Sequence, residues 1–303
     1  MDRKVQPGRP SRRGQMALDP LARTCSTFCM DQDQVRQAAE IIRACQTLVV
    51  TASAGMSADS GLTDILRDQG LWKTYPIYSR LGLRIVDLAN PSHFTRSPEF
   101  AWGFFGHRLG LARATEPHAG YAVLRRWSDR LAKAVVVLTV NVDGHFQKAG
   151  VSREAVTELY GSMHYLQCLT PCSDFVWRNQ EEIPVDPHTL LASRWPLCPA
   201  CGGVARPNVR MFSDSTWLPV RRDLQRQRLE AFLDERAGPG VVVLMLGGSD
   251  SVEAVQHLAE ELRLRGATLV CINPLGARFP QPHVSITRGA LEGLTVIDEA
   301  LRG

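Results

Sequence analysis

The sequence lacks a hydrophobic run long enough to cross a membrane. No stretch of its 303 residues approaches the roughly 20 apolar residues that a spanning helix needs. No apolar core follows the basic residues near the amino terminus, so we expect no secretory signal peptide. Internal repeats are also missing. These absences predict a soluble, cytoplasmic protein without a membrane partner.

The chain also lacks any excess of charge outside its first residues. Its net charge is +4, and five basic residues against Asp2 account for all of it: Arg3, Lys4, Arg9, Arg12 and Arg13. A basic tip can contact nucleic acid, but interspersed proline and glycine favour a disordered leader over residues 1–30. We therefore do not expect a nucleic-acid partner.

Eight cysteines are present, and four of them have the spacing of metal ligands. These are Cys168 and Cys172, spaced CxxxC, and Cys198 and Cys201, spaced CxxC and followed by two glycines. Zinc favours four thiolates held in two close pairs. The pattern predicts one structural zinc per chain, with buried or redox-active cysteines as the alternative. Cys25 and Cys29 have no second pair nearby and are predicted to be free thiols.

Four short apolar segments, rich in β-branched residues, are typical of buried parallel strands. They are residues 47–51, 135–140, 241–246 and 268–272. Helical patterns lie between them, as at residues 35–45 and 252–264. This alternation predicts the α/β class, with a doubly wound, Rossmann-like parallel sheet.

Two segments interrupt that alternation. Residues 72–130 contain several prolines and two helical patterns, at 100–112 and 119–130, which predicts a helical insertion beside the ligand edge of the sheet. Residues 160–204 contain the cysteine pairs and predict a small zinc-ribbon module. Residues 31–159 and 205–303 then form the Rossmann-like domain. The sequence does not indicate the oligomeric state.

The first and second strands each end in residues suited to a nucleotide. After the first come Ala54, Gly55, Ser57 and Gly61, whose small side chains let a diphosphate approach backbone N–H groups at a helix N-terminus. After the second come Asn141 and Asp143. The alternative for this pair is a capped turn, which uses the same residue types.

From about residue 46 to residue 297 the chain resembles the sirtuins, a family of NAD-dependent protein deacylases. The family's GAGxS and TQNIDG are matched by Ser53-Ala54-Gly55-Met56-Ser57 and Thr139-Val140-Asn141-Val142-Asp143-Gly144. Further matches follow in the family's order: Glu158-Leu159-Tyr160-Gly161-Ser162, Arg206 to Asp214, Gly247-Gly248-Ser249 and Ile272-Asn273-Pro274.

The resemblance implies a bound NAD as cosubstrate. Its diphosphate side is expected near the first loop, at Ser53, Ala54, Gly55, Ser57, Gly61 and Asp64. Its ribose and adenine are expected near Gly247, Gly248, Ser249 and Asn273. The resemblance also implies that Asn141 and Asp143 hold the nicotinamide ribose, and that Tyr160 occupies the position of the catalytic base.

That base is a histidine in the family, and its replacement is the main departure. A phenol titrates near pH 10 and an imidazole near pH 6.5, so forming the base at neutral pH costs an extra ~4–5 kcal/mol. Other departures lie on the nicotinamide and acyl-lysine sides: Ser53, Thr63, Ile65, Leu66, Val140, Arg210 and Ser213. His107, His145 and His164 are candidate substitute bases, and His118 is interpreted as structural.

Three functions follow from these residues. The first is a protein-lysine deacylase that transfers an acyl group to ADP-ribose with release of nicotinamide, weak or altered because of Tyr160. The second keeps NAD cleavage but changes the acceptor, giving ADP-ribosyl transfer to a protein or small molecule, or hydrolysis. The third is a non-catalytic NAD or ADP-ribose binder. We expect an acylated protein or a small-molecule acceptor as the partner.

Overall fold

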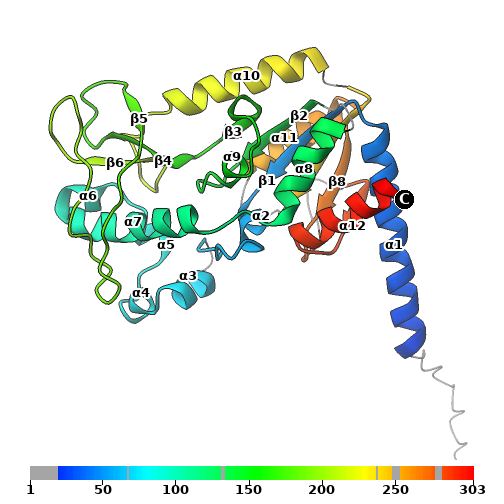
Figure 1. Ribbon diagram of the computed structural model, residues 1–303, viewed down its shortest axis with the longest axis horizontal. Helices are drawn as coiled ribbons and strands as arrows, with labels where there is room; N and C mark the ends of the chain where they lie inside the picture. Colours follow the sequence, from blue (N-terminus) through cyan, green and yellow to red (C-terminus); the bar gives the residue numbers. More distant parts are fainter. Residues whose placement is uncertain (1–19, 67, 131–133, 237, 248–252, 277–281) are drawn as a thin grey trace, which may run out of the picture.

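A six-stranded parallel sheet forms the centre of the larger domain (Figure 1). The computed structural model describes residues 20–66, 68–130, 134–236, 238–247, 253–276 and 282–303, with side chains from residue 32 onward except at 130. The strands are β1 (Thr47–Ala52), β2 (Ala134–Thr139), β3 (Val156–Glu158), β7 (Val241–Leu246), β8 (Thr268–Ile272) and β9 (Val284–Ile286). Their order is β3-β2-β1-β7-β8-β9.

Helices cover both faces of this sheet because successive strand residues point to opposite sides. Leu48 and Val50 of β1 pack with one group of helices, and Val49 packs with the other. The first group is α1 (Pro20–Ala44), α8 (Ala119–Arg130) and α12 (Ala290–Arg302). The second is α10 (Val220–Arg236) and α11 (Glu253–Leu264). The predicted doubly wound, Rossmann-like sheet is therefore confirmed.

A helical module and a zinc-ribbon module gather at one end of the molecule (Figure 1). The helices are α3 (Asp68–Thr74), α4 (Pro76–Arg80), α5 (Ile85–Leu88), α6 (Ser92–Arg96) and α7 (Pro98–Ala114). An antiparallel sheet of β4 (Gly161–Cys168), β5 (Val176–Arg178) and β6 (Ala205–Val209) forms the other module. Leu166 and Leu190 share one hydrophobic cluster with Phe94, Trp102 and Phe104, so the two modules share a core.

Three predicted boundaries shift. Helix α8 packs on the main sheet through Tyr121 and Trp127, because its apolar face covers β1 and β2, so the insertion ends before residue 119. Strand β6 pairs with β4, which extends the ribbon to Val209. Helix α1 begins at Pro20, so residues 20–30 are helical; a proline is well tolerated in the first turn. The remainder of the expected leader, residues 1–19, lies outside the described residues.

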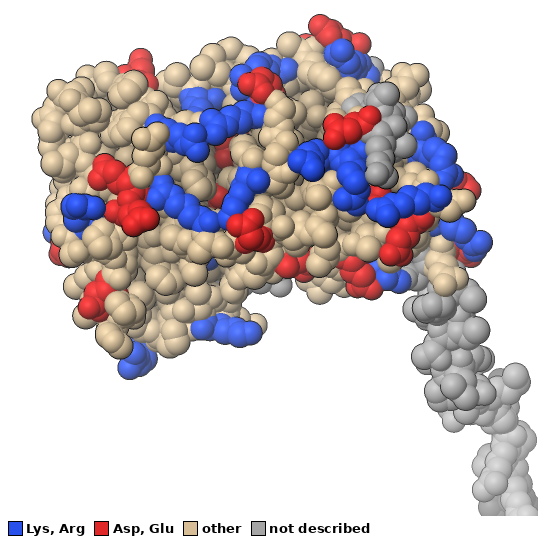
Figure 2. Space-filling model, in the orientation of Figure 1, with Lys and Arg blue, Asp and Glu red and all other residues tan. Residues whose placement is uncertain are grey.

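Short elements complete the part of the chain that the structure describes. They are α2 (Ala54–Ala58), α9 (His145–Lys148) and the 3₁₀ turn η1 (Arg153–Ala155). No helix in the described ranges is long and apolar enough to cross a membrane. On the face in Figure 2, basic side chains are interspersed with acidic ones. Along α10, for example, Arg222 pairs with Asp223 and Arg226 with Glu230.

Candidate nucleotide site and zinc centre

The carboxyl ends of β1, β2, β7 and β8 lie side by side. Parallel pairing puts Ala52 opposite both Thr139 and Leu246, and Leu246 opposite Ile272. Residues that follow these strands therefore meet at one edge of the sheet, where open α/β sheets bind ligands. Separate stretches of sequence supply Ser53, Asn141, Gly247 and Asn273 to this edge.

Asn141 joins the first loop to the end of β2. Its side-chain Nδ2 donates to the carbonyl of Ser53 at 2.9 Å and to Oγ of Ser57 at 2.9 Å. Its own backbone N–H donates to Oγ1 of Thr139. The structure thus brings together the residues that the sequence analysis assigned to one nucleotide site.

Asp143 is buried and held on both carboxylate oxygens. Oδ2 accepts from the Ser57 hydroxyl at 2.5 Å, and Oδ1 accepts from the backbone N–H of His145 at 3.0 Å. The second bond is the capped turn that the sequence analysis kept as an alternative. Because the first bond reaches across 86 positions to α2, the carboxylate also organises the loop, and a capped turn alone does not account for it.

Gly55 and Gly247 hold the ends of β1 and β7 in close contact. A Cβ added at Gly55 would lie 2.6 Å from Cα of Gly247, and Gly247 has a φ of 63°, a conformation that favours glycine. The hydroxyl of Ser53 donates to the carbonyl of Gly247. Gly248 and Ser249, predicted on the adenosine side, lie outside the described residues.

The remaining predicted cofactor residues form turns at the same edge. Asn273 is buried, and its side chain closes the turn after β8 by donating to the carbonyl of Gly276 and accepting from the N–H of Leu275. Gly61 has a φ of 94°, and a Cβ added there would meet no atom of the described residues within 4 Å. Asp64 accepts from the N–H of Leu66 at 3.0 Å. Backbone turns with small or amide residues fit a bound nucleotide.

Tyr160 lies beside this site and is half-buried. Its side chain packs with Val140, the residue before Asn141, and with Val255 of α11. Its carbonyl accepts from the N–H of Arg210, the residue that follows β6. The residue is therefore placed where β2, β4 and β6 come together, next to the strand end that carries Asn141.

The candidate substitute bases are committed to other contacts. Nε2 of His164 lies 2.7 Å from the carbonyl of Asp143, and burial lowers the pKa of His164 while this bond partly offsets it. His145 is fully buried. His107 lies 3.0 Å from the hydroxyl of Tyr75, and burial lowers its pKa. His118 bonds to the carbonyl of Met56 at 2.9 Å, which agrees with the structural role predicted for it.

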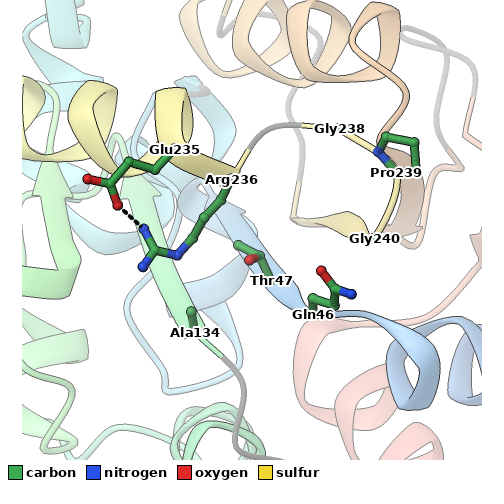
Figure 3. A pocket seen from close by; sticks show the side chains of 8 residues that line it. All are labelled: Gln46, Thr47, Ala134, Glu235, Arg236, Gly238, Pro239 and Gly240. Atoms are coloured by element: carbon green, nitrogen blue, oxygen red, sulfur yellow. Dashed lines mark hydrogen bonds and ion pairs between the residues drawn. The ribbon is translucent and has the colours of Figure 1, made fainter.

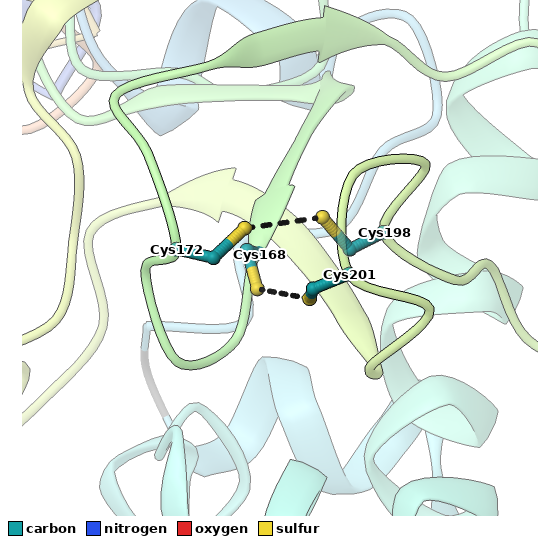
Figure 4. Close-up of side chains that lie close together, drawn as sticks. All are labelled: Cys168, Cys172, Cys198 and Cys201. Carbon is teal, nitrogen blue, oxygen red and sulfur yellow. Dashed lines mark hydrogen bonds between the residues drawn. The ribbon is translucent and has the colours of Figure 1, made fainter.

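The four predicted metal ligands form one cluster (Figure 4). The sulfurs of Cys168 and Cys201 are 3.6 Å apart, those of Cys172 and Cys198 are 3.7 Å apart, and all four lie within 4.8 Å of one another. Zn–S bonds of about 2.3 Å in a tetrahedron place sulfurs about 3.8 Å apart. The donor set therefore fits one zinc, and four thiolates leave no open position for catalysis, so the metal is structural.

A pocket of about 400 Å³ lies at the opposite edge of the main sheet (Figure 3). Gln46 and Thr47 before and at the start of β1, Ala134 at the start of β2, and Gly240 before β7 line it together with Arg236. These are the amino ends of the strands. The pocket is therefore separate from the nucleotide site.

Two buried contacts were missed by the sequence analysis. Arg206 of β6 and Asp214 of the following turn form an ion pair, and both residues stand in a motif that the sequence analysis had quoted. Tyr121 places its hydroxyl 3.3 Å from Oγ of Ser57. The sequence could not reveal the second contact, because Tyr121 lies outside the matched motifs and meets Ser57 only through the packing of α8 on the main sheet.

The fold and the site together define a Rossmann-like nucleotide-binding protein with an inserted zinc ribbon. Residues 53–250 match the sequence model of the Sir2 family, and the chain belongs to this family. It is 32% identical over 248 residues to an NAD-dependent protein deacylase of Aeropyrum pernix, with 82% of this chain and 89% of that protein covered. An NAD-dependent protein deacylase of Corynebacterium glutamicum is 31% identical, with 80% and 86% covered.

Solved structures agree with this family assignment. The chain resembles a Sir2 homologue–NAD complex with a TM-score of 0.66 and 26% identity, covering 88% of this chain and 92% of the other. A mutant Sir2 homologue in complex with ADP-ribose gives a TM-score of 0.69 at 25% identity, covering 88% and 96%. The predicted sirtuin membership is therefore confirmed.

Proposed function

We propose that this protein is an NAD-dependent protein-lysine deacylase that transfers an acyl group to ADP-ribose and releases nicotinamide. The observation that carries the proposal is the hydrogen-bonded set of Ser57, Asn141 and Asp143 at the carboxyl edge of the sheet. Two relatives of more than 30% identity are named NAD-dependent protein deacylases. The solved structure of a similar Sir2 homologue is that of its complex with NAD.

The residues at this edge fit a nicotinamide-nucleotide cosubstrate. NAD supplies the electrophilic carbon of its nicotinamide ribose and the ADP-ribose that accepts the acyl group. Gly55 and Gly247 leave room for close approach to the backbone. Asn141 and Asp143 offer an amide and a carboxylate, which can hold ribose hydroxyls. Both side chains bond to the hydroxyl of Ser57, so they are fixed before the ligand arrives, which favours tight and oriented binding.

We further propose that the deacylase activity is weak or altered because Tyr160 occupies the position of the catalytic histidine. A general base speeds proton transfer when its pKa lies near the working pH, and a phenol titrates far above neutrality. His164 and His145 do not replace it, because one bonds to the carbonyl of Asp143 and the other is fully buried. The acylated partner and a cytoplasmic location remain part of the proposal.

A second candidate is NAD hydrolysis or ADP-ribosyl transfer, which needs no base at position 160. One observation favours it: in the segment between Gly61 and α3, where the family places a shielding phenylalanine and an arginine, the chain has Ile65 and Leu66, and the Leu66 side chain is half exposed. A smaller, apolar cover admits water or another nucleophile more easily.

Nicotinamide release from NAD, measured with zinc-loaded protein in the presence and absence of acyl-lysine peptides, tests the proposal. Release that requires a peptide supports the deacylase. Release without a peptide supports hydrolysis or ADP-ribosyl transfer. Binding of NAD without any release would contradict both and leave a nucleotide-binding protein. Asn141→Ala is the matched control, since it should abolish release in either catalytic case.

A further inference from the structure

Tyr121 of α8 is completely buried beneath the nucleotide site. Its ring is held by three other rings, with centroids 4.8 Å from His118, 4.9 Å from Phe146 and 5.9 Å from His145. Its hydroxyl lies 3.3 Å from Oγ of Ser57. A buried phenol of this kind usually finds a hydrogen-bond partner, and here the partner belongs to the loop that carries the site.

The hydrogen count at Ser57 fixes the direction of every bond. A serine hydroxyl has one hydrogen to donate and two lone pairs to accept with. The Asp143 carboxylate can only accept, so it takes the hydrogen of Ser57, at 2.5 Å. Nδ2 of Asn141 can only donate, and it occupies one lone pair. Tyr121 must therefore donate to the second lone pair, which gives the chain Tyr121 to Ser57 to Asp143.

The environment keeps the phenol in its donating form. Burial raises the pKa of Tyr121, the negative charge of Asp143 raises it further, and the bond to Ser57 only partly offsets these effects. The hydroxyl therefore retains its hydrogen throughout the working range of pH. With both lone pairs occupied, the Ser57 hydroxyl has one arrangement, and Asp143 and Asn141 are oriented by it.

We propose that Tyr121 is a positioning residue of the nucleotide site. Its hydroxyl holds Ser57 so that Ser57 donates to Asp143, and Asn141 and Asp143 meet the nicotinamide ribose in a single arrangement. The inference rests on the proposed function, since it assigns the ribose to Asn141 and Asp143. Tyr121 touches none of the reacting atoms and acts through Ser57.

Tyr121→Phe tests this inference because it removes one oxygen and leaves the packed ring. We expect the affinity for NAD and for ADP-ribose, measured by calorimetry, to fall about 3- to 10-fold, as for the loss of one buried hydrogen bond. The matched control is Tyr78→Phe. Tyr78 is also buried, but its hydroxyl has no hydrogen-bond partner among the described residues, so its removal should leave the affinity unchanged.

A double-mutant cycle separates positioning from general stability. In the Ser57→Ala background, Tyr121→Phe should cause no further loss of affinity, because the partner through which it acts is gone. A merely structural tyrosine would weaken binding equally in both backgrounds, and that outcome would overturn the inference. If Tyr121→Phe does not fold, Ser57→Ala alone decides: unchanged affinity would show that the chain from Tyr121 to Asp143 orients nothing.

The readout also separates this inference from the proposed function. Wild-type protein that binds neither NAD nor ADP-ribose would overturn the proposed function. Wild-type protein that binds both, together with a Tyr121→Phe variant of equal affinity, would overturn the positioning role alone.

Discussion

The guanidinium of Arg206 and the carboxylate of Asp214 form an ion pair whose side chains are 0% and 1% exposed. Asp214 also accepts from the N–H groups of Met211 and Thr216, so it ties together the whole turn that follows β6. Arg206 in turn donates to the carbonyl of Val209 at 2.7 Å. The pair is thus the polar centre of the segment between the zinc ribbon and α10.

Removing the charge of Asp214 should leave a buried, uncompensated guanidinium. We expect Asp214→Asn to lower the free energy of unfolding by roughly 3–5 kcal/mol, measured by urea denaturation. The control is Glu230→Gln, which breaks the exposed pair with Arg226 and should change stability by less than about 1 kcal/mol. Equal effects of the two variants would contradict this account.

The same carboxylate should govern stability in acid. Burial by itself would raise the pKa of Asp214, but the hydrogen bonds and charge of Arg206 outweigh it, so the pKa is lowered. An unfolded aspartate has a pKa of ~3.9, so the pair contributes fully above about pH 5, and this contribution is lost as the pH falls through the folded pKa.

Asp214→Asn should therefore lose less stability than wild type between about pH 5 and pH 2, as measured by urea unfolding at a series of pH values. Some acid dependence should remain in the variant, because the pKa of Asp298 is also lowered: burial raises it, and bonds from Arg126, Trp127 and Arg302 outweigh burial. Parallel curves for variant and wild type would exclude the role of Asp214.

The zinc ribbon should depend on its metal. We expect one zinc per chain by elemental analysis, and Cys198→Ser should lose the zinc and lower the melting temperature. Because the ribbon shares a core with α4–α7, its loss should also increase proteolysis of those helices. Cys271→Ala is the control: this cysteine lies in β8 within the main core, so the variant should keep its zinc. A zinc-free, fully stable protein would refute the prediction.

Restoring an imidazole at position 160 should restore a base. Tyr160→His should raise peptide-dependent nicotinamide release at neutral pH by roughly 10-fold or more, with an ascending limb near pH 6.5 in the pH–rate profile. Tyr160→Phe is the companion variant, and it shows whether the phenol itself contributes. An unchanged rate in Tyr160→His would place the block at Ile65, Leu66 and Arg210 instead.

The contact between two glycines should tolerate no side chain. Gly55→Ala would bring a Cβ to 2.6 Å from Cα of Gly247, and we expect a loss of about 1–3 kcal/mol in stability together with weaker NAD binding. Gly110→Ala, at an exposed position of α7 where a Cβ would meet no described atom within 4 Å, should instead stabilise the protein by roughly 0.5–1 kcal/mol. Denaturation and calorimetry on both variants check the pair.

Much of the fold could be predicted because buried parallel strands are continuous apolar runs. Two of the predicted strands, 241–246 and 268–272, coincide with β7 and β8. β3 and β9 were missed, since three residues are too few to show a pattern. The packing of α8 on the main sheet was also missed, because an apolar helix face does not indicate which surface it will pack against.

The candidate site was predictable as far as its motifs reached. Ser57, Asn141 and Asp143 were identified from loops at strand ends, and parallel pairing brought them together. Tyr121 was not identified, because its role depends on how α8 packs on the main sheet. Whether His107, His145 and His164 are free to act as bases could not be predicted either, because this depends on their burial and on their hydrogen-bond partners.

Strand β4 begins directly after Tyr160 and ends at the zinc ligand Cys168. A single strand therefore connects Tyr160, the proposed position of the base, to the metal-binding cluster, and at about 3.3 Å per residue it does so over roughly 25 Å. On the proposed function, the supply of metal therefore becomes a condition for turnover, although the metal-binding cluster is far from the proposed site of reaction. A cell short of zinc would hold intact polypeptide with fewer competent molecules, and the measured activity of a preparation would report its metal loading as much as its concentration.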